Sequence, residues 1–426
     1  DVYKRQGYGM TEFLVQRSYS DKYNLIACAI GHHIYESRWL RDPKYLDQII
    51  HTWYRGNDGG PMKKMDKFSS WNADAVLARY MVDGDKDFML DMKKDLETEY
   101  QRWERTNRLK NGLYWQGDVQ DGMEESISGG RKKKYARPTI NSYMYGNAKA
   151  LSCMGILSGD EGMAMKYGMR ADTLRNLVEN ELWNTRHQFF ETMRTDSSAN
   201  VREAIGYIPW YFNLPDTTKK YEVAWKEILD EKGFSAPYGL TTAERRHPEF
   251  RTRGVGKCEW DGAIWPFASA QTLTAMVNFM NNYPQTVLSD SVYFRQMELY
   301  VESQYHRGRP YIGEYLDEVT GYWLKGDQER SRYYNHSTFN DLMITGLIGL
   351  RPRLDNTIEV NPLIPVDNWD WFCLDNVLYH GHNLTILWDK NGDRYHCGKG
   401  LRIFVDGKEV GYADTLTRIV CKDVLK

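Results

Sequence analysis

A short acidic loop carries the side chains with the clearest capacity for chemistry. Glycine costs about 1 kcal/mol relative to alanine inside a helix, so the glycines of residues 117–130 predict a loop. Clustered carboxylates supply hydrogen bonds and acid–base chemistry, and an indole beside them can stack on a sugar ring. The segment therefore indicates a sugar site, with a solvated acidic turn as the alternative. The carboxylates are Asp118, Asp121, Glu124 and Glu125, and Trp115 precedes them.

Composition limits the class of protein. The chain has 426 residues, enough for one large core and a smaller appended domain. A formal net charge of −2 predicts no basic face and no nucleic-acid partner. No apolar run approaches the roughly 20 residues of a membrane span, so no membrane partner is expected. The 14 Trp, 30 Tyr and 14 Phe suit a carbohydrate cleft, although large helical cores also use aromatic residues.

No motif predicts a metal or another cofactor. The six cysteines are scattered and form no C-x-x-C pair, which excludes the common zinc and redox motifs. His32, His33 and Glu36 are the one spacing that suggests a metal. Adjacent side chains on a helix point about 100° apart, so this spacing favours a hydrogen bond from His33 to substrate.

The chain begins at Asp1 without an initiator methionine. We therefore expect a fragment that works as a monomer or beside a further N-terminal domain. A missing export signal carries no information in such a fragment. A glycan substrate favours the periplasm or the extracellular space over the cytoplasm.

Helical periodicity dominates residues 1–350. Short Gly-Asp turns at 81–85 and 157–161 join similar helices into antiparallel pairs, as an (α/α)6 toroid requires. An α-solenoid is the alternative, but no fixed repeat of 30–50 residues is present. The expected helices span residues 23–30, 44–54, 70–80, 88–103, 141–157, 161–182, 219–229, 269–279, 289–304 and 334–350.

The pattern changes to strands after residue 350. Residues 357–360, 384–388 and 401–405 have strand character, and Asn391-Gly392 and Asp406-Gly407 predict hairpin turns. Residues 351–426 are thus expected to form a small β-sandwich domain packed on the toroid. We expect its role to be structural.

Several motifs occur in the order found in one known group of enzymes. Residues 121–126, 141–151, 182–191, 258–266 and 313–321 carry the likeness, and 333–337 precede the closing helix. The chain resembles the six-hairpin glycosidases, most closely glycoside hydrolase family 63 with its mannosylglycerate-hydrolase-like members. Trehalases are a more distant relation. The resemblance implies the (α/α)6 fold and a carbohydrate substrate.

The resemblance also implies the catalytic carboxylates. Residues 121–126 are similar to the family's G-M-D-N-S loop, in which the Asp is the general acid. Glu124 falls on that Asp and is one methylene longer, so Asp121 and Glu125 stay open as alternatives. Residues 314–321 are similar to the E-x-Y-x-x-x-T-G loop, in which the Glu is the general base, and Glu314 inherits that role.

Residues 258–266 keep a tryptophan frame but differ in charge. Family members usually show Y-W-R-G-P-I-W-P, whereas this chain reads Cys-Glu-Trp-Asp-Gly-Ala-Ile-Trp-Pro. We expect Glu259 and Asp261 to line the pocket and to change which sugar it recognises. Other side chains are expected to stack on or hydrogen-bond to the sugar, with core packing as the alternative for any one tryptophan. They are Trp71, Trp115, Glu125, Trp260, Trp265, Tyr315, His33, Asn335 and His336.

We therefore expect an inverting, exo-acting glycosidase with two carboxyl groups roughly 6.5–9.5 Å apart. The sugar stays open, with L-rhamnose and L-arabinofuranose among the candidates. A toroid can also form a non-catalytic carbohydrate-binding scaffold, a sugar epimerase or a polysaccharide lyase.

Overall fold

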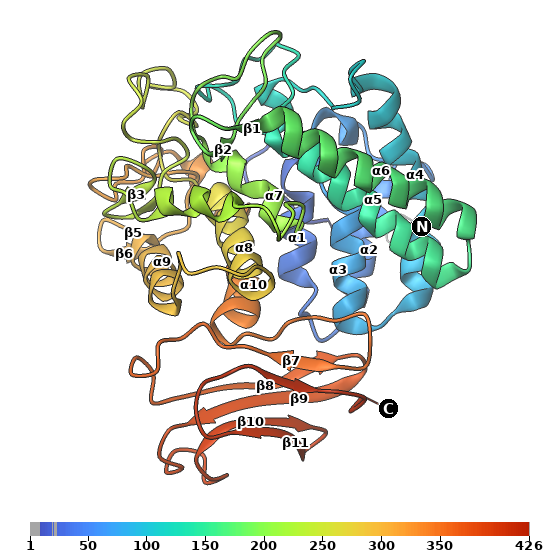
Figure 1. Cartoon of the computed structure of the whole chain (residues 1–426), viewed down its shortest axis with the longest axis vertical. Coiled ribbons are helices and arrows are strands. Elements are labelled where there is room, and N and C mark those ends of the chain that lie inside the picture. Colours follow the sequence, from blue (N-terminus) through green and yellow to red (C-terminus); the bar gives the residue numbers. More distant parts are fainter. Residues whose placement is uncertain (1–8, 19, 21–23, 426) are drawn as a thin grey trace.

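The computed structural model describes residues 9–18, 20 and 24–425. Helices make up the larger part and a β domain lies at one end of them (Figure 1). The chain thus forms the predicted mainly α, (α/α)6 toroid with a smaller C-terminal β domain. The helices are α1 (Ile30–Ser37), α2 (Lys44–Arg55), α3 (Asn72–Asp83), α4 (Lys86–Asn107), α5 (Pro138–Ser158), α6 (Glu161–Leu177), α7 (Ile208–Tyr211), α8 (Pro266–Asn282), α9 (Asp290–Ser303) and α10 (Phe339–Leu342).

Inner and outer helices alternate along the chain. In α5, 15 of 21 residues are buried, whereas in its neighbour α6 only 4 of 17 are. Helix α8 is buried over most of its length as well. An element buried nearly all round belongs inside the toroid, and a helix with one apolar stripe covers it from outside.

The two predicted Gly-Asp turns are confirmed. Gly84 ends α3 and Gly159 ends α5, each with a φ of 72° in the left-handed region that glycine adopts without strain. The following aspartates cap the next helices. Asp85 accepts a hydrogen bond from the Phe88 amide at 2.9 Å, and Asp160 from the Met163 amide at 3.0 Å.

Some expected helices differ from the prediction. Residues 219–229 form only a 3-10 helix, at Tyr221–Ile228. Helix α1 starts at Ile30, and Tyr23, where the prediction began, lies outside the described residues. Residues 334–338 are not helical, and α10 continues only through a π turn at Met343–Leu347. Gly349, with a φ of 83°, ends the helical run that the apolar pattern predicted to residue 350.

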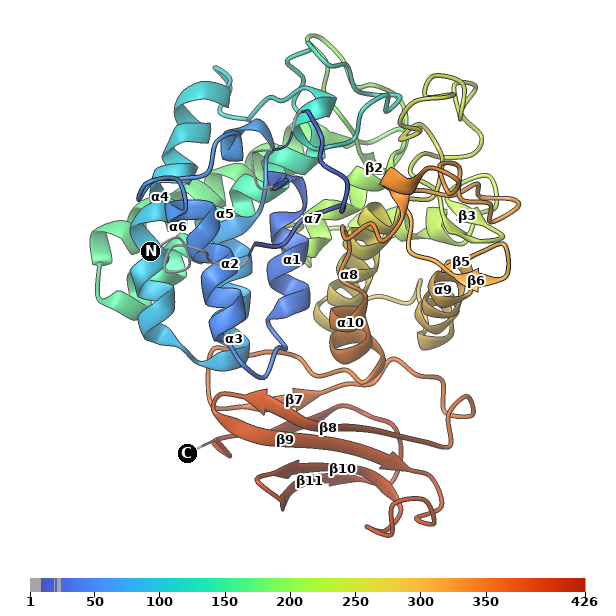
Figure 2. The same ribbon diagram turned by 180° about the vertical axis from the view of Figure 1, so that it is seen from behind.

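The β domain holds a four-stranded antiparallel sheet in the order β11-β10-β9-β8, with β7 and β12 paired separately (Figure 2). Asp406 and Gly407, both with positive φ, form the tight turn between β10 and β11, as predicted. The sheet touches the toroid where the His380 amide donates to the Val82 carbonyl at 2.7 Å. The strands are β7 (Ile358–Val360), β8 (Trp371–Tyr379), β9 (His382–Asp389), β10 (Gly400–Val405), β11 (Lys408–Ala413) and β12 (Ile419–Cys421).

Short hairpins occupy the loops of the toroid: β1 (Trp183–Asn184) with β2 (Phe189–Phe190), β3 (Ser235–Ala236) with β4 (Gly239–Leu240), and β5 (Tyr305–His306) with β6 (Arg309–Pro310). The long loops gather mainly at the end of the toroid away from the β domain (Figure 1). Within the described residues, no helix combines the length and apolarity needed to cross a membrane.

Candidate active site

A pocket of about 370 Å³ lies among the long loops of the toroid. Its walls come from segments far apart in sequence: the loop between α4 and α5, the loop before α8, and the loops between β6 and α10. The carboxyl side chains that line it are Glu12, Glu124 and Glu314, and the aromatic ones are Phe68, Trp260, Trp265, Phe267, Tyr334 and His336.

Glu124 enters the pocket from a tightly folded loop. Gly122 has a φ of 74°, and a Cβ there would lie 2.3 Å from the Cys28 sulfur, so the loop packs directly on the segment before α1. Removal from water disfavours the charged carboxylate and raises the pKa of Glu124 to about 7. A carboxyl group with that pKa can hold and release a proton near neutral pH.

Glu314 faces the same pocket in a different setting. Lys325 Nζ lies 3.2 Å from its Oε1, and Ser331 Oγ donates to its Oε2 at 3.0 Å. Both partners are buried, so the ion pair is shielded from solvent. Gly313 permits this approach, because a Cβ there would lie 2.3 Å from the Trp323 ring.

Asp121 and Glu125, the alternatives for the general acid, are placed differently. Neither is among the described residues that line the pocket. Asp121 is fully buried and its Oδ2 accepts from Arg137 Nε at 2.9 Å, and from Gln116 and Thr139. It therefore holds the acidic loop against α5. Glu125 lies 3.5 Å from Arg131 at the loop surface.

Glu259 and Asp261 also differ from their expected position, since neither is among the described pocket-lining residues. Glu259 forms an ion pair with Arg251 at 2.9 Å. Asp261 accepts from the backbone amides of Arg253 and Gly254 at 2.7 and 3.0 Å. Both carboxylates therefore stabilise the 251–257 loop. The two acidic residues in which this motif differs from the family's usual sequence thus form contacts within the protein.

Three predicted aromatic residues form one continuous stack. The Trp260 and Trp265 rings lie 4.1 Å apart with 17° between their planes, and Trp265 and Tyr315 lie 4.4 Å apart at 14°. Both tryptophans line the pocket, whereas Tyr315 supports them from behind and donates its hydroxyl to the Lys257 carbonyl. The stack gives the pocket a rigid apolar wall.

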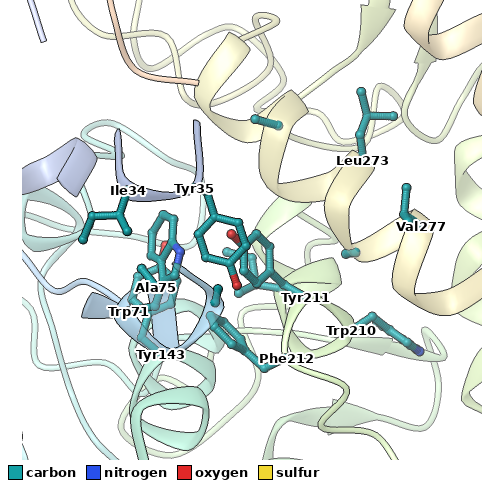
Figure 3. Packing of buried hydrophobic residues seen from close by; sticks show 14 of the residues in the cluster. Ile34, Tyr35, Trp71, Ala75, Tyr143, Trp210, Tyr211, Phe212, Leu273 and Val277 are labelled. Carbon is teal, nitrogen blue, oxygen red and sulfur yellow. The ribbon is translucent and has the colours of Figure 1, made fainter. Parts of the chain in front are cut away.

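Trp71 lies deeper than a sugar platform would. It is fully buried and contacts Phe267, which lines the pocket, and Tyr211, which lines a second cavity beside the β domain. Figure 3 shows its ring packed among Tyr35, Tyr143 and Tyr211. Trp71 therefore belongs to an aromatic layer that closes the base of the pocket.

Of the remaining predicted binding residues, His336 lines the pocket, whereas His33 and Trp115 do not. His336 lines the pocket, and burial lowers its pKa to about 3, so the imidazole is neutral near pH 7. Its Nε2 is buried without a hydrogen-bond partner in the described part of the chain. His33 Nε2 instead lies 2.9 Å from the Asn335 carbonyl, away from the pocket lining. Trp115 lies outside it too, beneath Lys134 at 4.6 Å.

Sequence reasoning missed two features of the pocket. One is Glu12, which precedes every motif and has no local signal. The other is an excess of cations over the three carboxylates. The cations come from four separate segments, and only Arg131 belongs to a basic run, residues 131–134: Lys67, Arg131, Lys257, Lys325 and Arg330.

Comparison with known proteins agrees with this fold. Residues 22–337 match the model of the mannosylglycerate hydrolase MGH1-like glycoside hydrolase domain, and residues 350–411 match the C-terminal domain of glycosyl hydrolase family 65. A GH63 mannosylglycerate hydrolase from Thermus thermophilus, solved with Tris, superposes with a TM-score of 0.59 at 12% identity, covering 79% of this chain and 95% of that one. At that identity the likeness shows the fold.

A much closer match is a solved structure named "Sialidase", with 95% identity and a TM-score of 0.97 over 98% of this chain. The present chain spans only 39% of the length of that protein. An uncharacterised conserved protein from Thermus thermophilus also matches, with a TM-score of 0.59 and 13% identity, covering 80% of this chain and 97% of that one.

Proposed function

Because this chain belongs to the MGH1-like glycoside hydrolase family, we propose that it removes a terminal sugar from a glycan by inverting hydrolysis. Glu124 is the proposed general acid and Glu314 the proposed general base. The observation that carries the proposal is that these two carboxyl groups, 190 residues apart in sequence, line one pocket.

Each group has the environment that its role requires. The protonated Glu124 carboxyl donates its proton to the glycosidic oxygen as the bond to the anomeric carbon breaks. Glu314 takes a proton from a water molecule, whose oxygen attacks that carbon from the opposite face of the ring. The products are the free sugar, with inverted configuration, and the released alcohol. The raised pKa of Glu124 and the ion pair of Glu314 with Lys325 support this division.

The closed base of the pocket supports exo action. The layer that contains Trp71 lies between the pocket and the second cavity, which supports entry of a glycan from the loop end. A terminal sugar fits such a site, whereas an internal residue of a long chain needs an open cleft. The Trp260–Trp265 wall is the proposed surface for the sugar ring.

The cations at the pocket favour a glycan that carries negative charge near the scissile bond. Lys257 and Arg330 line the pocket, and no ion pair with a pocket carboxylate is found for either of them in the described part of the chain. The name "Sialidase" belongs to a protein of which most lies outside the matched part. It therefore identifies no sugar for this pocket.

A panel of aryl glycosides and acidic and neutral plant oligosaccharides tests the proposal. Release of one monosaccharide from the non-reducing end supports it, and the test fails if no glycoside is hydrolysed. A near-ultraviolet absorbance from an unsaturated product would indicate a lyase. Binding without turnover would indicate a carbohydrate-binding scaffold.

We further propose that the chain acts without a metal or cofactor, as a monomeric unit of a longer protein in the periplasm or outside the cell. Activity that survives EDTA treatment, a monomeric mass in solution and cell fractionation of the full-length protein test these three points. Loss of activity with EDTA that added metal restores would refute the first.

A further inference from the structure

A segment before the helices of the toroid reaches into the pocket. Thr11 Oγ1 donates to the Asn24 carbonyl at 2.6 Å, and the Asn335 amide donates to the Glu12 carbonyl at 2.6 Å. The buried Phe13 ring packs against Tyr334, a pocket residue, at 5.3 Å. The segment is thus fixed on both sides of Glu12, by the chain that enters α1 and by the chain that precedes α10.

These contacts direct the Glu12 side chain into the pocket beside the proposed catalytic pair. Glu12 is 7% exposed and lines the pocket together with Glu124 and Glu314. The charged groups that act on it are these two carboxylates and Arg17, and the thiol of Cys28 is a further titratable neighbour. No protein hydrogen bond to its carboxyl oxygens is found within the described residues.

Burial and the two acidic neighbours raise the pKa of Glu12 to about 8, against the smaller opposing effect of Arg17. At neutral pH the group is therefore mostly protonated. A protonated carboxyl offers one O–H donor and an acceptor oxygen, which suits a sugar hydroxyl. An ionised Glu12 would instead place a third negative charge in the pocket.

We propose that Glu12 contacts the bound sugar as a neutral hydrogen-bonding residue, supplied by a segment that precedes the family's catalytic domain. The match to the family begins at residue 22, so Glu12 lies outside the matched residues. The proposal rests on the proposed function, because the sugar must occupy the pocket beside Glu124 and Glu314.

Glu12→Ala and Glu12→Gln test the contact, with Leu14→Ala as the control because Leu14 lies on the same segment and is 68% exposed. Glu12→Ala should lower kcat/KM about tenfold or more through the lost hydrogen bond. Glu12→Gln, which keeps a donor and an acceptor, should stay within a few-fold of the wild type at neutral pH. Leu14→Ala should match the wild type. A Glu12→Ala enzyme within twofold of the wild type would refute the contact.

Thermal unfolding provides a readout that needs no substrate. When a carboxyl group has a higher pKa in the folded than in the unfolded state, the protein loses stability as pH rises between the two values. The wild type should therefore lose more stability than Glu12→Gln between pH 5 and pH 8.5, while Leu14→Ala follows the wild type. An equal pH dependence in the wild type and Glu12→Gln would contradict the described environment.

The two proposals can fail separately. Turnover by the wild type, with loss in Glu314→Gln and none in Glu12→Ala, would refute the role of Glu12 alone. If no glycoside is hydrolysed, the proposed function fails. Calorimetric binding of the same glycosides then decides the Glu12 contact, since Glu12→Ala should weaken it about tenfold. Equal binding, or no binding by the wild type, would refute the contact.

Discussion

Glu124→Gln tests two properties of this residue. The carboxyl group has a proton to donate, and its burial disfavours the charged form. The amide keeps the size of the side chain and removes both. With a pKa of about 7, Glu124 is half protonated at pH 7 in the wild type. At pH 9 about 1% remains protonated, so steps that need this proton should slow roughly 50-fold between the two pH values.

The substrate dependence identifies the general acid. With a natural glycoside, whose alcohol leaving group needs a proton, Glu124→Gln should lose about 10²- to 10⁴-fold in kcat/KM. With a dinitrophenyl glycoside of the same sugar, which needs no protonation, it should stay within about tenfold of the wild type. Asp121 and Glu125 are the other candidates, so Glu125→Gln is the matched control and should keep activity on both substrates.

Stability gives the same variant a second expected outcome. The pKa of Glu124 is raised from 4.5 to about 7 on folding, so the wild type loses stability as pH rises through this interval. The shift corresponds to at most about 3 kcal/mol. Glu124→Gln lacks this loss. Its free energy of unfolding, measured by urea denaturation, should therefore rise relative to that of the wild type between pH 4.5 and 8. Equal losses on both glycosides, with no change in the pH dependence of stability, would mean that Glu124 is neither the general acid nor a buried carboxyl with a raised pKa.

Three other side chains of the site can be tested by single substitutions. Glu314→Gln should lower kcat by about 10³-fold or more on every substrate, the dinitrophenyl glycoside included, while the surface control Glu302→Gln keeps full activity. Asp121→Asn removes the ion-pair partner of the buried Arg137, leaving only the more distant Glu203 and Asp118, and should destabilise the fold by about 3 kcal/mol in urea denaturation, whereas an unchanged midpoint would mean that the pair contributes nothing. Trp265→Ala interrupts the aromatic stack and should raise KM more than it lowers kcat, and an unchanged KM would remove the sugar from that wall.

The fold followed from local signals. These signals are the amphipathic helices, the two Gly-Asp turns and the change to strand patterns after residue 350. Each depends on residues close in sequence, and helix pairs recur along the toroid. The helix expected over 334–350 was wrong for the same reason. Its apolar spacing is helical, yet Gly349 has a positive φ and residues 334–338 form no regular secondary structure, which the spacing of apolar residues does not reveal.

The site was predictable only where a motif and a pocket coincide. Glu124 and Glu314 lie in loops whose glycines and acids indicate them, and both line the pocket. The buried pairing of Asp121 depends on Arg137, 16 residues away, and is not visible in the spacing of the acids. Glu12 lies 302 residues from Glu314 and belongs to no motif, so only the folded chain brings them together.

The configuration of the first product distinguishes inverting from retaining hydrolysis and therefore tests the roles proposed for Glu124 and Glu314. The measurement is proton NMR of the released sugar during the first minutes of hydrolysis, with the fastest glycoside found in the panel and before mutarotation mixes the anomers. The anomer opposite to that of the substrate should appear first, because Glu314 activates a water across the ring from Glu124. Release of the same anomer would mean that a carboxylate attacks the sugar itself, and it would contradict the roles assigned to Glu124 and Glu314.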